Sequence, residues 1–158
     1  MGTLSDYLIQ DHQRCDMLLR QTQQHVGAAD WVDAGRAAAA FLGALERHVR
    51  IEEDIVFPAY ERALGTEAMP TTAMRADHQR VRALAQRLAS AIEARSAHDF
   101  VAHAESLLLT MHLHSEKEEG VLYPVIERVL AQRSAELIEA ARALDADPGA
   151  GSASTGAI

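Results

Sequence analysis

The sequence of 158 residues is poor in residues that crosslink a chain or interrupt its helices. It has one cysteine, four prolines, three phenylalanines and one tryptophan. A lone cysteine excludes an internal disulfide, so the composition favours a reducing cytoplasm. Abundant alanine with so little proline favours helices over sheets. The length suits one domain with a single core. We therefore expect an all-α, single-domain protein.

The sequence also lacks long apolar runs and basic clusters. No run approaches the roughly 18 residues that would span a bilayer, and no basic segment followed by an apolar core opens the chain. The net charge is −8, whereas nucleic-acid binding needs a clustered basic face. We expect a soluble, cytoplasmic protein with neither membrane nor nucleic acid as a partner.

Apolar residues recur at helical spacing in several segments bounded by caps and breakers. We expect long helices over residues 4 to 26, from Asp30 to near Pro58, over residues 72 to 94 and from Ser96 to near Pro124, then a short fifth helix over residues 134 to 144. The two prolines are expected to kink their helices. Short connections predict an antiparallel up-down-up-down four-helix bundle spanning residues 1–144, and residues 145–158 have the composition of a disordered tail.

One pattern occurs twice between residues 11 and 130, with an offset of 66 residues. Asp11-His12-Gln13-Arg14 returns as Asp77-His78-Gln79-Arg80, and His48, Glu52, Glu53 and Pro58 return as His114, Glu118, Glu119 and Pro124. Polar residues that stay in register in both copies indicate a shared geometry. The bundle is therefore expected to consist of two duplicated helix pairs.

The repeated histidines and glutamates predict a metal site. His48 and Glu52 are four residues apart, which places both on one helix face, and their flanking residues are apolar, so this face should point into the core. The same holds for His114 and Glu118. A buried carboxylate costs several kcal/mol unless it is paired or bound to a metal, so a metal-free polar network is the weaker alternative. The candidate ligands are His12, His48, Glu52, His78, His114 and Glu118.

Imidazole with carboxylate suits iron, manganese or zinc better than calcium, and helix bundles with such inward side chains are a known scaffold for a pair of irons. Nearby polar residues are expected outside the ligand set. His112 should face away from the site, His103 lies about 16 Å along the helix axis from His114, and Glu53 and Glu119 should serve as outer or surface acids.

This pattern resembles the hemerythrin-like, or HHE cation-binding, domain family over roughly residues 5 to 130. The resemblance rests on His12, His48-Val49-Arg50-Ile51-Glu52-Glu53, Phe57-Pro58, His78, His114-Ser115-Glu116-Lys117-Glu118-Glu119 and Tyr123-Pro124. It implies a non-haem di-iron site with a bridging oxo or hydroxo group, two bridging carboxylates and histidines that cap the metals.

The oxygen carriers of this family have a fifth histidine at the position of Arg82. Asp16 is its equivalent in the first copy, and the two could pair at the edge of the site. One metal would then have fewer protein ligands, which disfavours reversible oxygen carriage. The open position would admit water, peroxide, nitric oxide or a further side chain such as Tyr7, Cys15 or Asp16.

The symmetry of the duplication predicts that His12 with His48 caps one metal and His78 with His114 the other, while both glutamates bridge. Two functional classes follow. A binding module would hold oxygen, peroxide or nitric oxide, or serve as an iron store or sensor. A di-iron enzyme would instead have peroxidase-like, catalase-like or oxidase activity.

Overall fold

The computed structural model describes residues 2–65 and 69–146, and all regular structure within these residues is helical. No described helix is both long and apolar enough to cross a membrane. Residues 145 and 146 belong to the last helix. The rest of the expected tail lies outside the described residues, so the proposed domain boundary stays a prediction.

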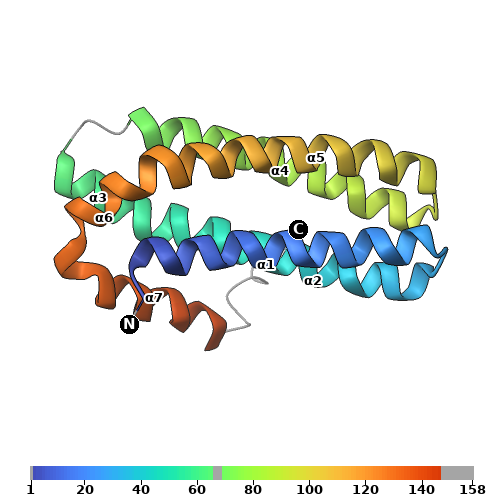
Figure 1. The fold of residues 1–158 in the computed structure, drawn as a ribbon, viewed down its shortest axis with the longest axis horizontal. Helices are drawn as coiled ribbons and strands as arrows, with labels where there is room; N and C mark the ends of the chain where they lie inside the picture. The colour runs from blue at the N-terminus through green and yellow to red at the C-terminus, as the bar shows by residue number, and fades with distance from the viewer. Residues whose placement is uncertain (1, 66–68, 147–158) are drawn as a thin grey trace, which may run out of the picture.

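Four antiparallel helical rods form the bundle, and a shorter helix packs across one end (Figure 1). The elements in chain order are α1 (Leu4–Gly27), α2 (Trp31–Arg50), η1 (Ile51–Val56), α3 (Phe57–Leu64), α4 (Met69–Glu93), α5 (Ala97–Lys117), η2 (Glu118–Leu122), α6 (Tyr123–Val129), η3 (Ala131–Arg133) and α7 (Ser134–Ala146). The second rod consists of α2, η1 and α3, and the fourth of α5, η2 and α6. The predicted all-α bundle with a fifth helix is confirmed.

The third rod begins earlier than residue 72, because Pro70 lies inside the first turn of α4 instead of before it. Proline is tolerated in a first turn, where its missing N–H would have no helical partner. Helix α7 contributes Leu137 and Ala141 to the core, and its Ser134 hydroxyl accepts a hydrogen bond from the Leu4 N–H. The fifth helix therefore covers the end of the bundle where the chain begins.

A π-helical turn precedes each proline at which a kink is expected. The N–H of Phe57 bonds to the carbonyl of Glu52, and the N–H of Tyr123 bonds to that of Glu118, each five residues back. The wider turn accommodates the missing N–H of the proline, and Pro58 lies in the first turn of the next α-helical segment. Both π turns carry a candidate glutamate ligand, which they align with the aromatic residue five positions later.

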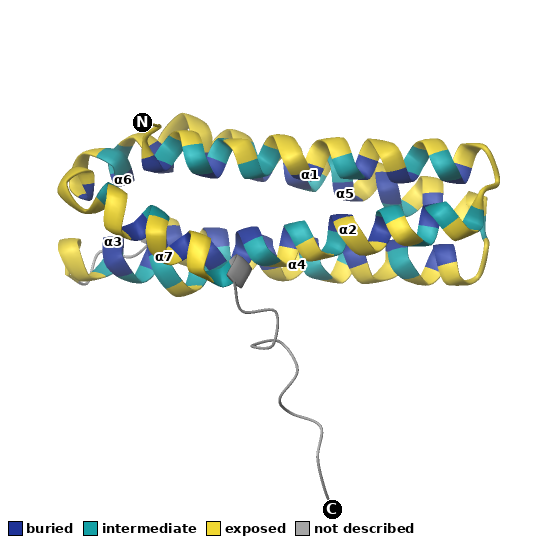
Figure 2. Cartoon of the chain, turned by 90° about the horizontal axis from the view of Figure 1, so that it is seen from below, coloured by how far each residue is buried: buried dark blue, intermediate teal, exposed yellow. Residues whose placement is uncertain are grey.

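The core consists of two apolar clusters with the polar candidates between them. One contains Leu19, Phe41, Leu45, Leu88 and Leu107. The other contains Leu8, Ile51, Phe57, Leu122 and Tyr123. Buried residues lie along the inward sides of the rods (Figure 2). The site thus has apolar surroundings at both ends, which strengthens electrostatic interactions within it.

Candidate metal centre

The six predicted ligands converge in the middle of the bundle. Glu52 and Glu118 are 0% exposed, and the side chains of the four histidines are at most 10% exposed. Nε2 of His12 lies 3.1 Å from Nε2 of His48, and Nε2 of His78 lies 3.1 Å from Nε2 of His114. Two ligands about 2.1 Å from one metal at a right angle lie roughly 3 Å apart. Both histidine pairs therefore have the spacing of adjacent metal ligands.

One oxygen of each buried glutamate has no hydrogen-bond partner among the described residues. These atoms are Glu52 Oε2 and Glu118 Oε1. Imidazole nitrogens approach them closely, with His78 Nε2 at 3.0 Å and His114 Nε2 at 2.9 Å, but without hydrogen-bond geometry. A buried carboxylate oxygen without a donor is costly. Nitrogen and oxygen atoms that face a common point fit a cation held between them.

The six residues form two overlapping groups of four that share both glutamates. One group is His12, His48, Glu52 and Glu118; the other is His78, His114, Glu52 and Glu118. The ligand atoms within each group lie within 4.8 Å of one another. The groups follow the duplication, with one histidine pair from each copy. The geometry thus offers two adjacent cation positions with both carboxylates between them.

Each of the four histidines directs its other ring nitrogen, Nδ1, toward a carboxylate. The pairs are His12 with Glu119 at 2.7 Å, His78 with Glu53 at 2.9 Å, His48 with Asp11 at 3.4 Å and His114 with Asp77 at 3.3 Å. A carboxylate on Nδ1 fixes the tautomer that leaves Nε2 free for a metal and raises its basicity. Glu53 and Glu119 belong to neither of the two four-residue groups, and their place outside the ligand set stays a prediction.

Asp11 and Asp77 were not predicted as part of the site, although both lie in the repeated Asp-His-Gln-Arg segment. A cation anchors each of them: Arg47 donates to Asp11 at 3.0 Å, and Lys117 bonds to Asp77. Burial raises the pKa of both aspartates, but His48 with Arg47 lowers that of Asp11 and Lys117 with His114 lowers that of Asp77, so each pKa is below its ordinary value. The aspartates therefore stay ionised as acceptors for the histidines.

The charge of the site favours protonated histidines when no metal is present. Burial opposes protonation of His78, but Glu118 and Glu52 outweigh burial and raise its pKa to about 10. Burial opposes protonation of His12 likewise, and Glu118 with Glu119 raises its pKa to about 9. Burial also raises the pKa of Glu118, yet its three imidazole neighbours hold it well below the ordinary value. Without metal, the protons on His12 and His78 therefore supply positive charge beside the buried glutamates.

The two halves of the site differ at one aromatic position. Phe57 stacks on His78 with a centroid separation of 6.0 Å, and its equivalent Tyr123 stacks on His12 at 5.7 Å. The Tyr123 hydroxyl donates to Glu52 and lies 3.0 Å from Glu118 Oε2. Burial and both carboxylates raise the pKa of Tyr123 well above its usual value, so the phenol is a proton donor here. Comparing the copies could have identified this extra hydroxyl.

Of the further side chains considered as ligands, two border the site. A cavity of about 20 Å³, enough for one or two waters, is lined by all four histidines together with Cys15 and Asp16. Burial and nearby Asp11 raise the pKa of the Cys15 thiol to about 12. Tyr7 instead accepts a hydrogen bond from Arg47 at 2.6 Å, outside the lining of this cavity.

The suggested Arg82–Asp16 pair is wrong. Arg82 bonds to Glu46 at 2.8 and 2.9 Å and to Glu53 at 3.3 Å. Two acids from the second rod are within its reach, which explains the preference. His112 is exposed and pairs with Glu116 at 3.2 Å, as its predicted outward face requires.

Comparison with known proteins agrees with the geometry. The hemerythrin HHE cation-binding domain matches residues 3–124 and again residues 69–151, so the second match starts 66 residues after the first and reproduces the internal repeat. A hemerythrin-like protein of Schizosaccharomyces pombe is 28% identical over 134 residues, which cover 84% of this chain and 63% of that relative. The chain thus spans less than two thirds of that relative's length. No solved structure matches. The buried His/Glu groups and these matches indicate metal-ion binding, and the chain belongs to the hemerythrin HHE cation-binding domain family.

Proposed function

We propose that this protein holds two iron ions at the six converging residues and binds a small ligand, such as oxygen, peroxide or nitric oxide, beside them. The observation that carries the proposal is the pair of four-residue groups that share Glu52 and Glu118. A set of histidines and carboxylates is what non-haem iron prefers, and manganese and zinc are the competing ions. Bound iron would supply redox chemistry and an open coordination position.

The roles of the side chains follow from their geometry. His12 and His48 would hold one ion, His78 and His114 the other, and the two glutamates would lie between the ions. The carboxylate oxygens without a hydrogen bond, Glu52 Oε2 and Glu118 Oε1, would supply negative charge to the ions. The Nδ1 carboxylates would keep the imidazoles oriented and basic.

The small cavity beside the histidines favours a ligand of a few atoms. Its volume of about 20 Å³ excludes an organic substrate, whereas a diatomic molecule or peroxide has a suitable size. Arg82 replaces the fifth histidine of the oxygen carriers and bonds to surface-facing acids. Its side chain is not part of the cavity lining, so it leaves room at one ion for such a ligand.

A peroxide-consuming enzyme is the second candidate, because Tyr123 keeps a buried, protonated hydroxyl at one half of the site only. This hydroxyl bonds to both buried carboxylates, so it could supply a proton beside them, although Tyr123 does not line the cavity itself. Steady release of oxygen from peroxide, or peroxide-dependent oxidation of an added reductant, would identify the enzyme. Stoichiometric reaction without turnover would identify the binding module.

The metal content provides the direct test. Metal-free protein reconstituted anaerobically with ferrous iron is expected to retain about two irons per chain after gel filtration, because two ligand groups are present. Elemental analysis measures the ratio, and near-ultraviolet absorption after exposure to air reports paired ferric ions. A chain that retains no metal, or one zinc in preference to iron, would contradict the proposal.

The outer aspartates should tune affinity without being essential. Asp77→Asn is expected to weaken metal binding about 10- to 100-fold, because an amide on His114 Nδ1 neither raises the basicity of the ring nor fixes its tautomer as a carboxylate does. Competition with a chelator of known affinity measures the change. Asp54→Asn is the control, since Asp54 is 61% exposed and pairs with Arg50. Equal losses in both variants would show that the aspartate contact is incidental.

A further inference from the structure

Three hollows meet at Asp16, which lies on α1. The cavity beside the histidines is the innermost. A cleft of about 420 Å³ between α1 and α5 shares His12, Asp16 and Ser115 with that cavity. A shallower trough of about 510 Å³ runs along the outer side of α1 and also includes Asp16. Asp16, with His12 and Ser115, therefore stands between the solvent-facing cleft and the cavity beside the histidines.

On the opposite side of the bundle, the equivalent space between α4 and the second rod is crossed by the side chain of Arg82. By the 66-residue repeat, Arg82 is the equivalent of Asp16, and Glu46 and Glu53 are the equivalents of His112 and Glu119. Arg82 extends from α4 to Glu46 on α2 and Glu53 on η1, with all three contacts at 3.3 Å or less. This arginine ties the second and third rods together outside the histidines. The duplicated bundle thus has one bridged seam and one open seam.

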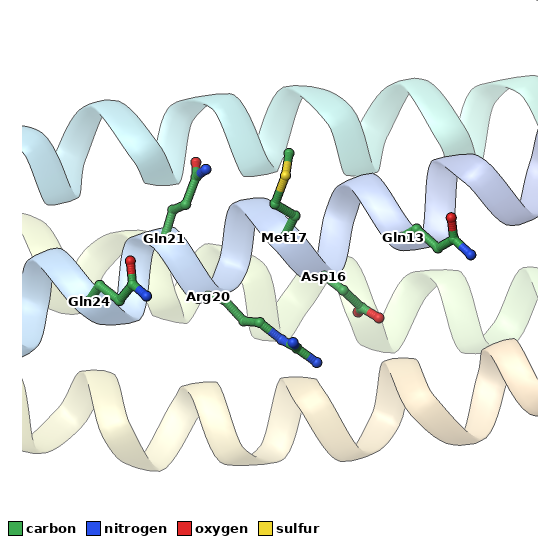
Figure 3. Close-up of a pocket in the computed structure, with 6 residues that line it drawn as sticks. All are labelled: Gln13, Asp16, Met17, Arg20, Gln21 and Gln24. Carbon is green, nitrogen blue, oxygen red and sulfur yellow. The ribbon is translucent and has the colours of Figure 1, made fainter.

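The open seam is acidic. Its ionisable lining consists of three acids, Asp16, Glu116 and Glu119, against Arg20 and the two histidines His12 and His112. Figure 3 shows Asp16 and Arg20 extending from α1 toward α5. Glu119 joins the cleft directly to a candidate ligand, because it bonds to His12 Nδ1 at 2.7 Å. An acidic cleft raises the local concentration of cations and lowers that of anions.

We propose that the cleft between α1 and α5 is the route by which divalent metal ions reach the buried site, with Asp16 as its attracting group and Arg82 closing the equivalent seam. The proposal rests on the function proposed above, since it requires that the six residues bind metal. The two carboxylate oxygens without a hydrogen bond give the ion a destination, and both belong to residues with 0% exposure. The narrow inner cavity requires an ion to leave most of its hydration shell in the cleft, where acidic side chains can replace water.

The test is the rate at which metal-free full-length chain takes up Co²⁺, followed by stopped-flow absorbance. Asp16→Asn removes the charge alone and is expected to slow uptake about 3- to 10-fold and to weaken its dependence on salt. Asp16→Arg imitates the bridged seam, because the new guanidinium would lie near Glu119 as Arg82 lies near Glu53. It is expected to slow uptake by more than about tenfold. Asp54→Asn, an exposed acid outside the cleft, controls for net charge.

The final Co²⁺ content separates this proposal from the one on which it rests. Two Co²⁺ per chain in every variant, reached more slowly in the Asp16 variants alone, supports the route. Two Co²⁺ per chain with unchanged rates in both Asp16 variants overturns the route and leaves the metal site intact. A lower final content in Asp16→Asn also overturns it, because Asp16 would then be a ligand. A wild-type chain that binds no Co²⁺ overturns both proposals.

Discussion

A Glu52→Gln chain is expected to lose both metal ions, although the substitution replaces only one carboxylate oxygen by an amide nitrogen. Glu52 belongs to both four-residue groups, so its charge and second oxygen serve each position. Glutamine keeps the volume but brings one ligand oxygen and no charge. Elemental analysis after anaerobic reconstitution should fall from about two irons per chain to near zero. Glu118→Gln should do the same, because Glu118 has the equivalent position in the repeat.

Histidine variants distinguish a shared ligand from one that serves a single ion. His114→Ala should mainly loosen one ion, because His114 belongs to one group only. His112→Ala is the matched control, since His112 lies two residues away with its side chain 68% exposed. Circular dichroism shows whether each variant keeps its helices. If His112→Ala removed iron as thoroughly as His114→Ala, or Glu52→Gln kept one tightly bound iron, the shared-glutamate assignment would be wrong.

The fold and the six converging residues could be predicted because both depend on periodic signals. Helical spacing of apolar residues locates the rods, and two histidine–glutamate pairs at four-residue spacing locate the inward faces. The 66-residue repeat then relates the pairs to each other. No contact between distant segments had to be known, since the bundle topology brings equivalent positions together.

The missed features depend on contacts that have no periodic signature. Local spacing does not predict that Asp11 on one helix contacts His48 on the next. It also does not predict that Arg82 bonds to Glu46 instead of Asp16. The π turns were missed because proline signals an interruption but does not say how the chain absorbs it. The role of Tyr123 could have been predicted, because its equivalent in the first copy, Phe57, has no hydroxyl. The sequence thus locates the ligands more readily than the groups that position them.

Metal removal is expected to destabilise the protein by an amount that grows with pH. An ion present at a thousand times its dissociation constant adds about 4 kcal/mol to the free energy of unfolding, or roughly 8–16 °C in Tm for a chain of this size. Bound imidazoles must be neutral, yet His12 and His78 have pKa values of about 9 and 10 in the metal-free protein. Metal binding at pH 7 should therefore release about two protons, and affinity should rise with pH.

The stability of the metal-free protein should fall as the pH rises, whereas the metal affinity increases. A histidine whose pKa is raised by folding contributes stability that is complete below its unfolded value of 6.5 and is lost as the pH rises through 9 to 10. Glu118, Asp11 and Asp77 have lowered pKa values, so their contribution is present above about pH 4.5 and is lost on acidification. Metal-free stability should thus be greatest between about pH 5 and 6.5.

Thermal melts of both forms between pH 6 and 9 measure this divergence directly. The Tm of the metal-free chain should fall across the range, while that of the iron-loaded chain should hold or rise, so the gap between them widens. Calorimetry of metal binding in two buffers with different ionisation enthalpies counts the released protons independently. A gap that stays constant from pH 6 to 9, with no protons released at pH 7, would mean that the buried carboxylates do not hold His12 and His78 in their charged form before the metal arrives.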